Sequence, residues 1–213
     1  MERLLLILLC AAALRAAEPP AEPGPVLAPG GNDAAWRPLF AALAANGAVM
    51  AAFTERRWFP VRDQPVVLEG EMRFSPERGL SLSYLQPERR MVIADAQGLV
   101  LRDARGRSRA VPAGPESAAS LAALLPVMHF DLAALMRRFE VRAARAGTAW
   151  RLDFVPRDPA EARILGRLVV CGEDEVVRRL EFRRSEKQRI EIQLREARVR
   201  VVFSPEDLRR FFR

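Results

Sequence analysis

The sequence predicts a mainly β (α+β) protein: a curved, antiparallel, incomplete β-barrel whose short helices form a lid over a concave apolar face. Three observations lead to this fold class. Apolar residues recur at every second position in many short runs, the breaks between runs are rich in Gly, Pro and Asp, and a few short helical patterns lie between the runs. Each run has one apolar face, so a sheet of about ten such strands needs a cover, which the helices supply.

Composition supports a single globular domain. The chain has 213 residues, half of them apolar, which is enough for a sizeable core. The formal net charge of +7 comes almost entirely from Arg, because Lys187 is the only Lys. This charge is compatible with an acidic partner or an anionic membrane surface. Nucleic acid is not an expected partner, because Arg and acidic residues alternate along the strands and no segment combines Arg with stacking aromatics.

Three regions are expected along the chain. Residues 1–17 have the features of a secretory signal peptide, with Arg3 before an apolar run that is too short to anchor the protein in a membrane. A buried N-terminal helix is the alternative, and Cys10 lacks the small preceding residue of a lipidation site. Residues 18–33 are rich in Pro and are expected to form an extended tether. Residues 34–213 form the domain, and we expect a soluble protein exported through a cleaved signal peptide.

The domain is expected to begin with a short helix and a strand. Asn32 or Asp33 caps the helix, and Asn46-Gly47 ends it. Its apolar face carries Trp36, Leu39, Phe40 and Leu43. Alternation from Val49 then predicts a strand that ends at Pro60.

The central stretch from Pro65 to Asp103 predicts a four-stranded antiparallel meander, because its apolar runs are separated by turns that contain Pro or Gly. The last two of these strands run from Met91 to Asp95 and from Leu99 to Asp103. In the first two strands the residues expected on the apolar face are Leu68, Gly70, Met72, Phe74, Leu80, Leu82 and Tyr84.

Short helices are expected in mid-chain, after one more strand at Arg107 to Val111. Ser117 caps a helical stretch that Pro126 interrupts, and Asp131 caps a second stretch. The apolar residues of these helices are Leu121, Leu124, Leu125, Leu132, Leu135, Met136 and Phe139. These helices are the expected lid.

The last part of the chain returns to strands. In the first, Trp150, Leu152 and Phe154 lie on one face and Arg151 and Asp153 on the other. Four more strands are expected, at Ile164–Cys171, Val176–Arg183, Arg189–Glu196 and Arg198–Phe203. Their inward residues are Leu168, Val170, Leu180, Phe182, Ile190, Ile192, Leu194, Val199, Val201 and Phe203. The run Ser204–Asp207 caps a last helical turn with Leu208, Phe211 and Phe212.

The segments Val49–Glu55 and Leu68–Leu80 resemble the periplasmic outer-membrane lipoprotein carriers of the LolA type. The likeness extends from Trp36 to the C-terminus and rests on the order of elements: a helix, a Phe-Thr strand, a Gly-containing strand, a Pro-Gly turn, mid-chain helices and a final run of strands. Two positions depart from the family. Glu55 stands where carriers commonly have Gln, and Ser75 precedes the turn Pro where the best-known members have an Arg that ties the lid shut. The sequence therefore looks like a divergent member.

The resemblance implies a carrier that holds the acyl chains of lipoproteins or related lipids in an apolar cavity and moves them from the inner to the outer membrane. It also implies an inner-membrane exporter and an outer-membrane acceptor as partners, with no cofactor or metal, and we expect a monomer. Met beside aromatic residues on the inward face favours a cavity, because Met adapts to irregular apolar shapes. The residues expected to line it are Leu68, Met72, Phe74, Leu80, Leu82, Tyr84, Met91, Ile93, Met128, Leu135, Met136, Trp150, Leu152, Phe154, Leu180, Phe182, Ile190 and Ile192.

Two other interpretations remain open. The alternation also fits an ordinary packed core, and the same fold fits an interaction or sensor module that binds a membrane-anchored partner without moving lipid. An enzyme is not expected. His129 is the only His and is expected at a helix end or as a buried structural residue, while Cys171 is expected to be an inert strand residue or a free thiol. Carboxylates such as Asp158 and Glu161 lie in a predicted loop, where solvation explains them.

Overall fold

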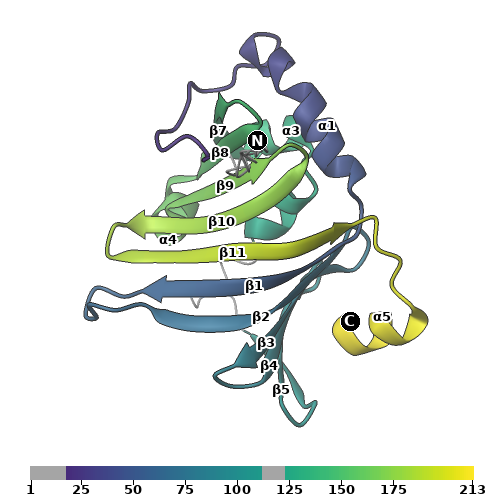
Figure 1. Cartoon of the computed structure of the whole chain (residues 1–213). Helices are drawn as coiled ribbons and strands as arrows, with labels where there is room; N and C mark the ends of the chain where they lie inside the picture. Colours follow the sequence, from purple (N-terminus) through teal and green to yellow (C-terminus); the bar gives the residue numbers. More distant parts are fainter. Residues whose placement is uncertain (1–17, 112–122) are drawn as a thin grey trace, which may run out of the picture.

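The computed structural model describes residues 18–111 and 123–213, which form one antiparallel sheet of eleven strands with short helices (Figure 1). The strand order is β6-β5-β4-β3-β2-β1-β11-β10-β9-β8-β7. The strands are β1 (Val49–Trp58), β2 (Val66–Ser75), β3 (Gly79–Gln86), β4 (Arg90–Asp95), β5 (Gly98–Asp103), β6 (Ser108–Val111), β7 (Phe139–Ala146), β8 (Ala149–Pro156), β9 (Arg167–Glu173), β10 (Val176–Ser185) and β11 (Gln188–Val199). The sheet curls without closing into a barrel, which confirms the predicted fold class.

The helices are short. They are the 3-10 helix η1 (Asn32–Ala35) and the α-helices α1 (Arg37–Ala45), α3 (Leu132–Arg138), α4 (Pro159–Leu165) and α5 (Pro205–Phe211); residues 123–128 are also helical. Asp131 and Ser204 cap α3 and α5 as predicted, since their side chains accept hydrogen bonds from the third residue beyond them. The predicted cap of the first helix was wrong, because no side chain caps η1 or α1. Asp33 accepts from Arg37 instead, at 2.9 and 3.1 Å.

Strand β1 lies in the middle of the sheet and joins its two halves. Phe53 is paired with Gly70 of β2 on one side and with Leu194 of β11 on the other. Glycine is required at position 70, because a Cβ there would lie 2.3 Å from the Ser83 carbonyl oxygen and 2.7 Å from the Phe53 ring. The fully buried Phe53 ring occupies this space and meets the Tyr84 ring edge-to-face, with centroids 5.4 Å apart.

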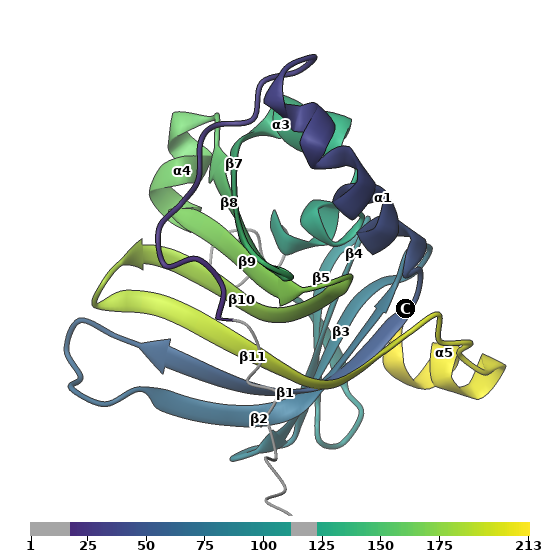
Figure 2. The same cartoon turned by 45° about the horizontal axis from the view of Figure 1, so that its top comes forward.

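The core lies on the concave face of the sheet, under the helices. Figure 2 shows α1 and α3 crossing this side of the molecule. The residues that these helices and residues 123–128 bury against the sheet are Leu39, Phe40, Leu43, Leu124, Val127, Met128, Leu135 and Met136. The helices therefore cover the apolar face, as the sequence predicted.

Strand β7 was missed by the sequence analysis. Phe139 was expected in the helix capped by Asp131, whereas it begins β7. Phe139, Val141 and Ala143 are buried in alternation along this strand. The intervening Glu, Arg and Ala residues weaken the apolar contrast, so local sequence alone does not separate strand from helix here.

Helix α4 was also missed. The Asp158 side chain caps it by accepting from the backbone N–H groups of Ala160 and Glu161, at 2.7 and 3.1 Å. Asp158 and Glu161 are therefore part of a helix and its cap, and the predicted loop was wrong. Ile164 belongs to the same helix and does not start a strand, because Gly166, with φ of 66°, ends the helix before β9.

Two further boundaries differ. The predicted strand Arg198–Phe203 does not form, because β11 continues through an irregularity at Glu196 to Val199 and the chain then turns away at Arg200, whose φ is 55°. The Arg200 N–H donates to the carbonyl of Asn46 at 2.8 Å. Pro126 does not interrupt its helix, since residues 123–128 are all helical. The predicted cap Ser117 and Leu121 lie outside the described residues.

Part of the segment expected to be a tether is bound to the edge of the sheet. The Leu27 N–H donates to the Val141 carbonyl at 2.7 Å, and the Ala143 N–H donates to the Pro25 carbonyl at 3.3 Å. Leu27 is only 2% exposed. The end of this segment next to η1 therefore extends the sheet beyond β7.

Helix α5 packs on the outer face of the sheet, opposite the core, beside β2–β5 (Figure 1). The Arg73 guanidinium lies 3.6 Å from the centroid of the Phe211 ring, and Phe212 is 2% exposed. Arg213 donates to both carboxylate oxygens of Asp95, at 2.6 and 2.7 Å. This part of the sheet is therefore covered on both faces.

Candidate functional site

The concave face of the sheet brings together all but two of the residues predicted to line a cavity. They form a single apolar cluster with the helices. Its members from the predicted set are Leu68, Met72, Phe74, Leu80, Leu82, Tyr84, Met128, Leu135, Met136, Trp150, Leu152, Phe154, Leu180, Phe182, Ile190 and Ile192. Strands from both halves of the sheet therefore contribute to one apolar surface.

Met91 and Ile93 were placed on the wrong face. In the register of β3 with β4, Ile93 pairs with Ser81 and Met91 with Ser83, whereas Leu82 pairs with Val92. Because neighbouring residues of a strand point to opposite faces, Met91 and Ile93 lie on the outer face, where α5 packs. Every residue from Met91 to Ala94 is apolar, so alternation within β4 does not indicate which face is the core.

The concave face is filled by side chains. Trp150, Leu152 and Phe154 are fully buried, and Leu82 is 1% exposed. One void of ≈ 30 Å³ lies between the helices and the sheet, bounded by Phe74, Met128 and Phe130 among others. A space of this size holds about one water molecule. The side chains of the predicted set that are buried therefore leave little open space beside them.

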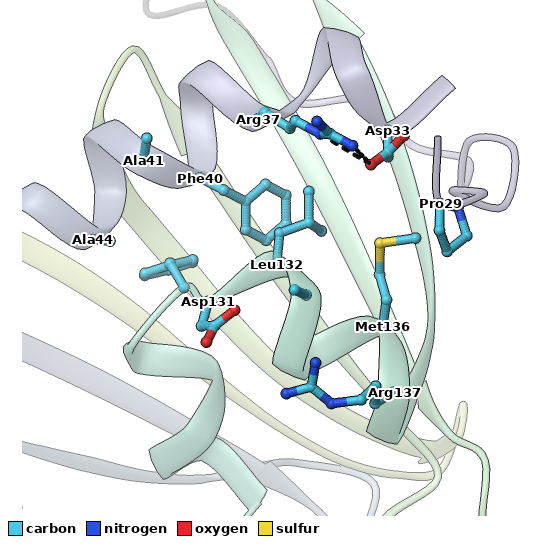
Figure 3. Close-up of a pocket in the computed structure, with 12 residues that line it drawn as sticks. Pro29, Asp33, Arg37, Phe40, Ala41, Ala44, Asp131, Leu132, Met136 and Arg137 are labelled. Carbon is cyan, nitrogen blue, oxygen red and sulfur yellow. Dashed lines mark hydrogen bonds and ion pairs between the residues drawn. The ribbon is translucent and has the colours of Figure 1, made fainter. Parts of the chain in front are cut away.

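The accessible apolar space lies between α1 and α3 instead (Figure 3). It is a groove of ≈ 590 Å³, within the range of about 300–1,000 Å³ that is common for ligand pockets. Its apolar lining consists of Pro29, Phe40, Ala41, Ala44, Phe130, Leu132, Ala133 and Met136. Only Met136 of these was in the predicted cavity set. Phe40 and Leu132 were predicted to be apolar helix residues. Helical periodicity therefore identified residues that line the groove, but it did not indicate that they border accessible space.

Phe130 separates this groove from the inner void, because it lines both. Its ring meets the Phe40 ring edge-to-face, with centroids 6.3 Å apart. Its backbone φ is 53°, in the left-handed region that bulky residues rarely adopt. The turn that holds it is closed by its N–H, which donates to the Val127 carbonyl at 3.0 Å. Phe130 thus lies at the boundary between the helix groove and the core.

Charged residues line the edge of the groove. The hydrogen bond from Arg37 is the main cause that lowers the pKa of Asp33, so this carboxylate is ionised at neutral pH. Asp131 and Arg137 lie at the α3 side. An apolar floor with charged edges suits an amphiphile whose chain is buried and whose polar end stays at the surface.

Comparison with known proteins decides the family. A family model described as outer membrane lipoprotein carrier protein LolA-like matches residues 28–198, which is most of the chain. The protein belongs to this LolA-like family. The resemblance identified from the sequence is therefore confirmed. No curated protein matches the chain.

Solved structures are similar to this LolA-like chain at low identity. For a LolA superfamily protein from Nitrosomonas europaea the TM-score is 0.44 and the identity 6%, with 81% of this chain and 96% of that chain covered. For a putative outer membrane lipoprotein-sorting protein domain from Vibrio parahaemolyticus the values are 0.44 and 9%, with 82% and 94% covered. For the Pseudomonas aeruginosa MucA/MucB complex they are 0.45 and 14%, with 84% and 60% covered. At these TM-scores the likenesses add nothing to the family match.

The position where this LolA-like chain has Glu55 in place of Gln has a structural role. Glu55 is on the concave face and 1% exposed, and it accepts hydrogen bonds from Arg57 and from the Tyr84 hydroxyl, the latter at 2.7 Å. Arg57 also donates to the Tyr84 hydroxyl at 3.2 Å. Burial, followed by the Glu55 charge, raises the pKa of Tyr84, so the phenol stays neutral. The three residues form a satisfied polar cluster at the end of the apolar face away from α1.

The groups with catalytic potential in the LolA-like domain are engaged in packing. The His129 ring meets the Phe74 ring edge-to-face at 5.4 Å, directly after the helical residues 123–128. The Cys171 thiol is buried in β9, accepts a hydrogen bond from Arg179 at 3.4 Å, and has a pKa raised by burial, so its thiolate is disfavoured. Within the described ranges no group of three or more His, Cys, Asp and Glu side chains is placed to hold a metal ion.

Proposed function

We propose that this LolA-like protein binds the acyl chains of lipoproteins or related lipids and carries them across the periplasm from the inner to the outer membrane. The family is that of lipoprotein carriers, which supports this function. Within the described residues no helix is long and apolar enough to cross a membrane. Export through the signal peptide expected at residues 1–17, with an inner-membrane donor and an outer-membrane acceptor, belongs to the same proposal.

The observation that carries the proposal is the apolar path from the helix groove to the core. The groove between α1 and α3 is open to solvent, and Phe130 is the boundary between it and the void beside Phe74 and Met128. Phe74, Met128 and Leu194, which line that void, belong to the same apolar cluster as the rest of the concave face, which includes Leu82, Trp150 and Phe182. An acyl chain that displaces Phe130 would therefore pass from one apolar surface to the next.

The energy scale fits a carrier. Each methylene removed from water contributes about 0.8 kcal/mol, so a long acyl chain resists crossing an aqueous compartment by roughly 10 kcal/mol. A groove of ≈ 590 Å³ removes part of this barrier. The void beside Phe74 and Met128 is only ≈ 30 Å³, so the residues around it must move apart to admit the rest of the chain. The short helices α1 and α3 are the elements that would move, since they cover the concave face (Figure 2).

The first test is native mass spectrometry of the protein purified from a periplasmic extract, followed by titration with a fluorescent acyl probe. We expect co-purified lipid and saturable probe binding. Leu132→Glu places a charge in the groove and is expected to weaken probe binding at least about tenfold, because an unpaired charge is unfavourable on an apolar floor. Leu208→Glu is the matched control, since Leu208 is also half-buried but lies on α5.

The proposal is rejected if the wild-type protein binds neither an acyl probe nor a lipopeptide. A stoichiometric complex with a membrane-anchored protein, recovered without lipid, would support the interaction module instead. Equal probe binding by the Leu132 and Leu208 variants would leave the carrier function but remove the groove as its entrance.

A further inference from the structure

The loops at one end of the sheet carry most of the exposed large apolar side chains. Among the described residues these side chains are Phe59 and Val61 of the β1–β2 loop, Val67 at the start of β2, Leu85 at the end of β3 and Ile164 of α4. The register places these segments at the same end, because Arg57 pairs with Val66 and Ile190, and Glu69 pairs with Gln86. Figures 1 and 2 both show the β1–β2 loop, the β10–β11 turn and α4 on this side.

Val61 is the most exposed of them at this end. It is 92% exposed and Phe59 is 41% exposed, and both lie in the loop that directly follows Trp58. The Trp58 ring stacks on the Arg189 guanidinium at 3.9 Å. An aromatic and aliphatic tip on a polar loop is costly in water but favourable at the boundary between lipid headgroups and acyl chains.

The same end carries an excess of positive charge. The connections between strands at this end, residues 59–65, 87–89, 104–107, 157–166 and 186–187, contain seven cationic side chains and five acidic ones. The described connections at the opposite end, residues 46–48, 76–78, 96–97, 147–148, 174–175 and 200–204, contain two cationic and three acidic side chains. The charge is therefore polarised along the strands, with the apolar tips on the positive end.

We infer that this end of the sheet docks the protein onto an anionic phospholipid membrane, with Phe59 and Val61 inserted among the headgroups. Apolar side chains alone would equally fit a protein partner, but the surrounding cations complement the negative surface of a bilayer. The interaction is peripheral, because it uses a loop tip and surface charge. This inference does not rest on acyl-chain binding in the α1–α3 groove.

The test compares two Val→Glu variants in vesicle co-sedimentation. Val61→Glu puts a negative charge at the tip, and Val202→Glu is the control, since Val202 is 93% exposed but lies in the linker before α5. Vesicles contain about 30% phosphatidylglycerol in phosphatidylcholine, or phosphatidylcholine alone. The wild type and Val202→Glu are expected to bind the anionic vesicles, and Val61→Glu at least about fivefold less. Binding is expected to fall when salt rises from about 0.1 to 0.5 M.

Equal melting temperatures would show that both variants are folded. The inference is overturned if the wild type does not sediment with anionic vesicles, or if the two variants lose binding equally. Binding only to native membranes, abolished by protease treatment of those membranes, would identify a protein receptor and also overturn it. The acyl-probe titration is an independent measurement. If the wild type binds anionic vesicles but no acyl probe, the carrier function is rejected and this inference stands. If it binds the acyl probe but no vesicles, only this inference is rejected.

Discussion

Phe130 is the residue on which the path from groove to core depends, and its backbone conformation makes a direct prediction possible. At φ of 53° a side chain beyond glycine is strained by about 1–3 kcal/mol. Replacing Phe130 by Ala removes a buried ring and is expected to cost about 3–5 kcal/mol of stability. Phe130→Gly loses the same ring but relieves the strain, so it is expected to be at least as stable as Phe130→Ala in urea unfolding.

Phe139 gives the control for this comparison. It is also buried, but its φ is −122°, where Gly has no advantage. The Phe139→Gly variant is therefore expected to be less stable than Phe139→Ala by about 0.5–1 kcal/mol. If Phe130→Ala were also clearly more stable than Phe130→Gly, the left-handed backbone conformation at position 130 would be contradicted.

Tyr84 offers a second prediction, because it is the only Tyr in the chain. Burial and then the Glu55 charge raise its pKa, so its ultraviolet titration is expected above the ordinary value of 10. Since the folded-state pKa is raised, the associated stability is present below pH 10 and is lost as the pH rises through the folded value. Glu55→Gln removes the second cause, so the pKa of Tyr84 should fall while burial keeps it above 10.

Glu71→Gln is the matched control for this titration. Glu71 also forms an ion pair, with Arg73. It lies on the outer face of the sheet and is not among the groups that change the pKa of Tyr84. The Tyr84 titration should be unchanged in this variant. An unchanged pKa in Glu55→Gln would show that the Glu55 carboxylate does not act on the phenol.

At the scale of elements, helix α5 determines whether the outer face of β2–β5 stays covered. Ile93 is fully buried and Val100 is 7% exposed, and both point to this outer face. Truncation after Ser204 removes α5 and the Arg213–Asp95 ion pair. We expect the truncated protein to self-associate, because a newly exposed apolar patch on a sheet favours association. Light scattering after size-exclusion chromatography measures this.

Asp95→Asn separates the cover from the ion pair. It weakens only the contact with Arg213, which is partly exposed, so a loss of about 1 kcal/mol or less is expected and the protein should keep the oligomeric state of the wild type. A truncated chain that also stays monomeric at high concentration would show that α5 is not needed as a cover.

The elements also show what sequence patterns can and cannot predict. Clear alternation identified β1, β2, β3 and β8, and Ser204 and Asp131 identified the starts of two helices. Strand β4 is apolar on both faces, so its register with β3 and not its own pattern assigns Met91 and Ile93 to the outer side. The predicted cavity residues are together, but whether they enclose space depends on side-chain packing, which alternation does not encode.

At the scale of the whole molecule, the seam between β1 and β11 holds the two halves of the sheet together. Each half consists of neighbouring strands joined in sequence order, and among the eleven described strands only the β1–β11 pair joins strands that are distant in the chain. The strands on both sides were predicted, but their pairing was not. Pairing between distant strands depends on the closure of the whole sheet, for which a local pattern carries no signal.

This seam also fixes an order of assembly. Val49 pairs with Val199, so β1 is synthesised long before its second partner exists, whereas β2 to β6 pair with neighbours that immediately precede them. Closing so long a loop is entropically costly and slow compared with forming a hairpin. If the chain is exported N-terminus first, one edge of β1 stays unpaired until β11 has crossed the membrane. That edge is then the part of the nascent protein most open to a chaperone, or to aggregation.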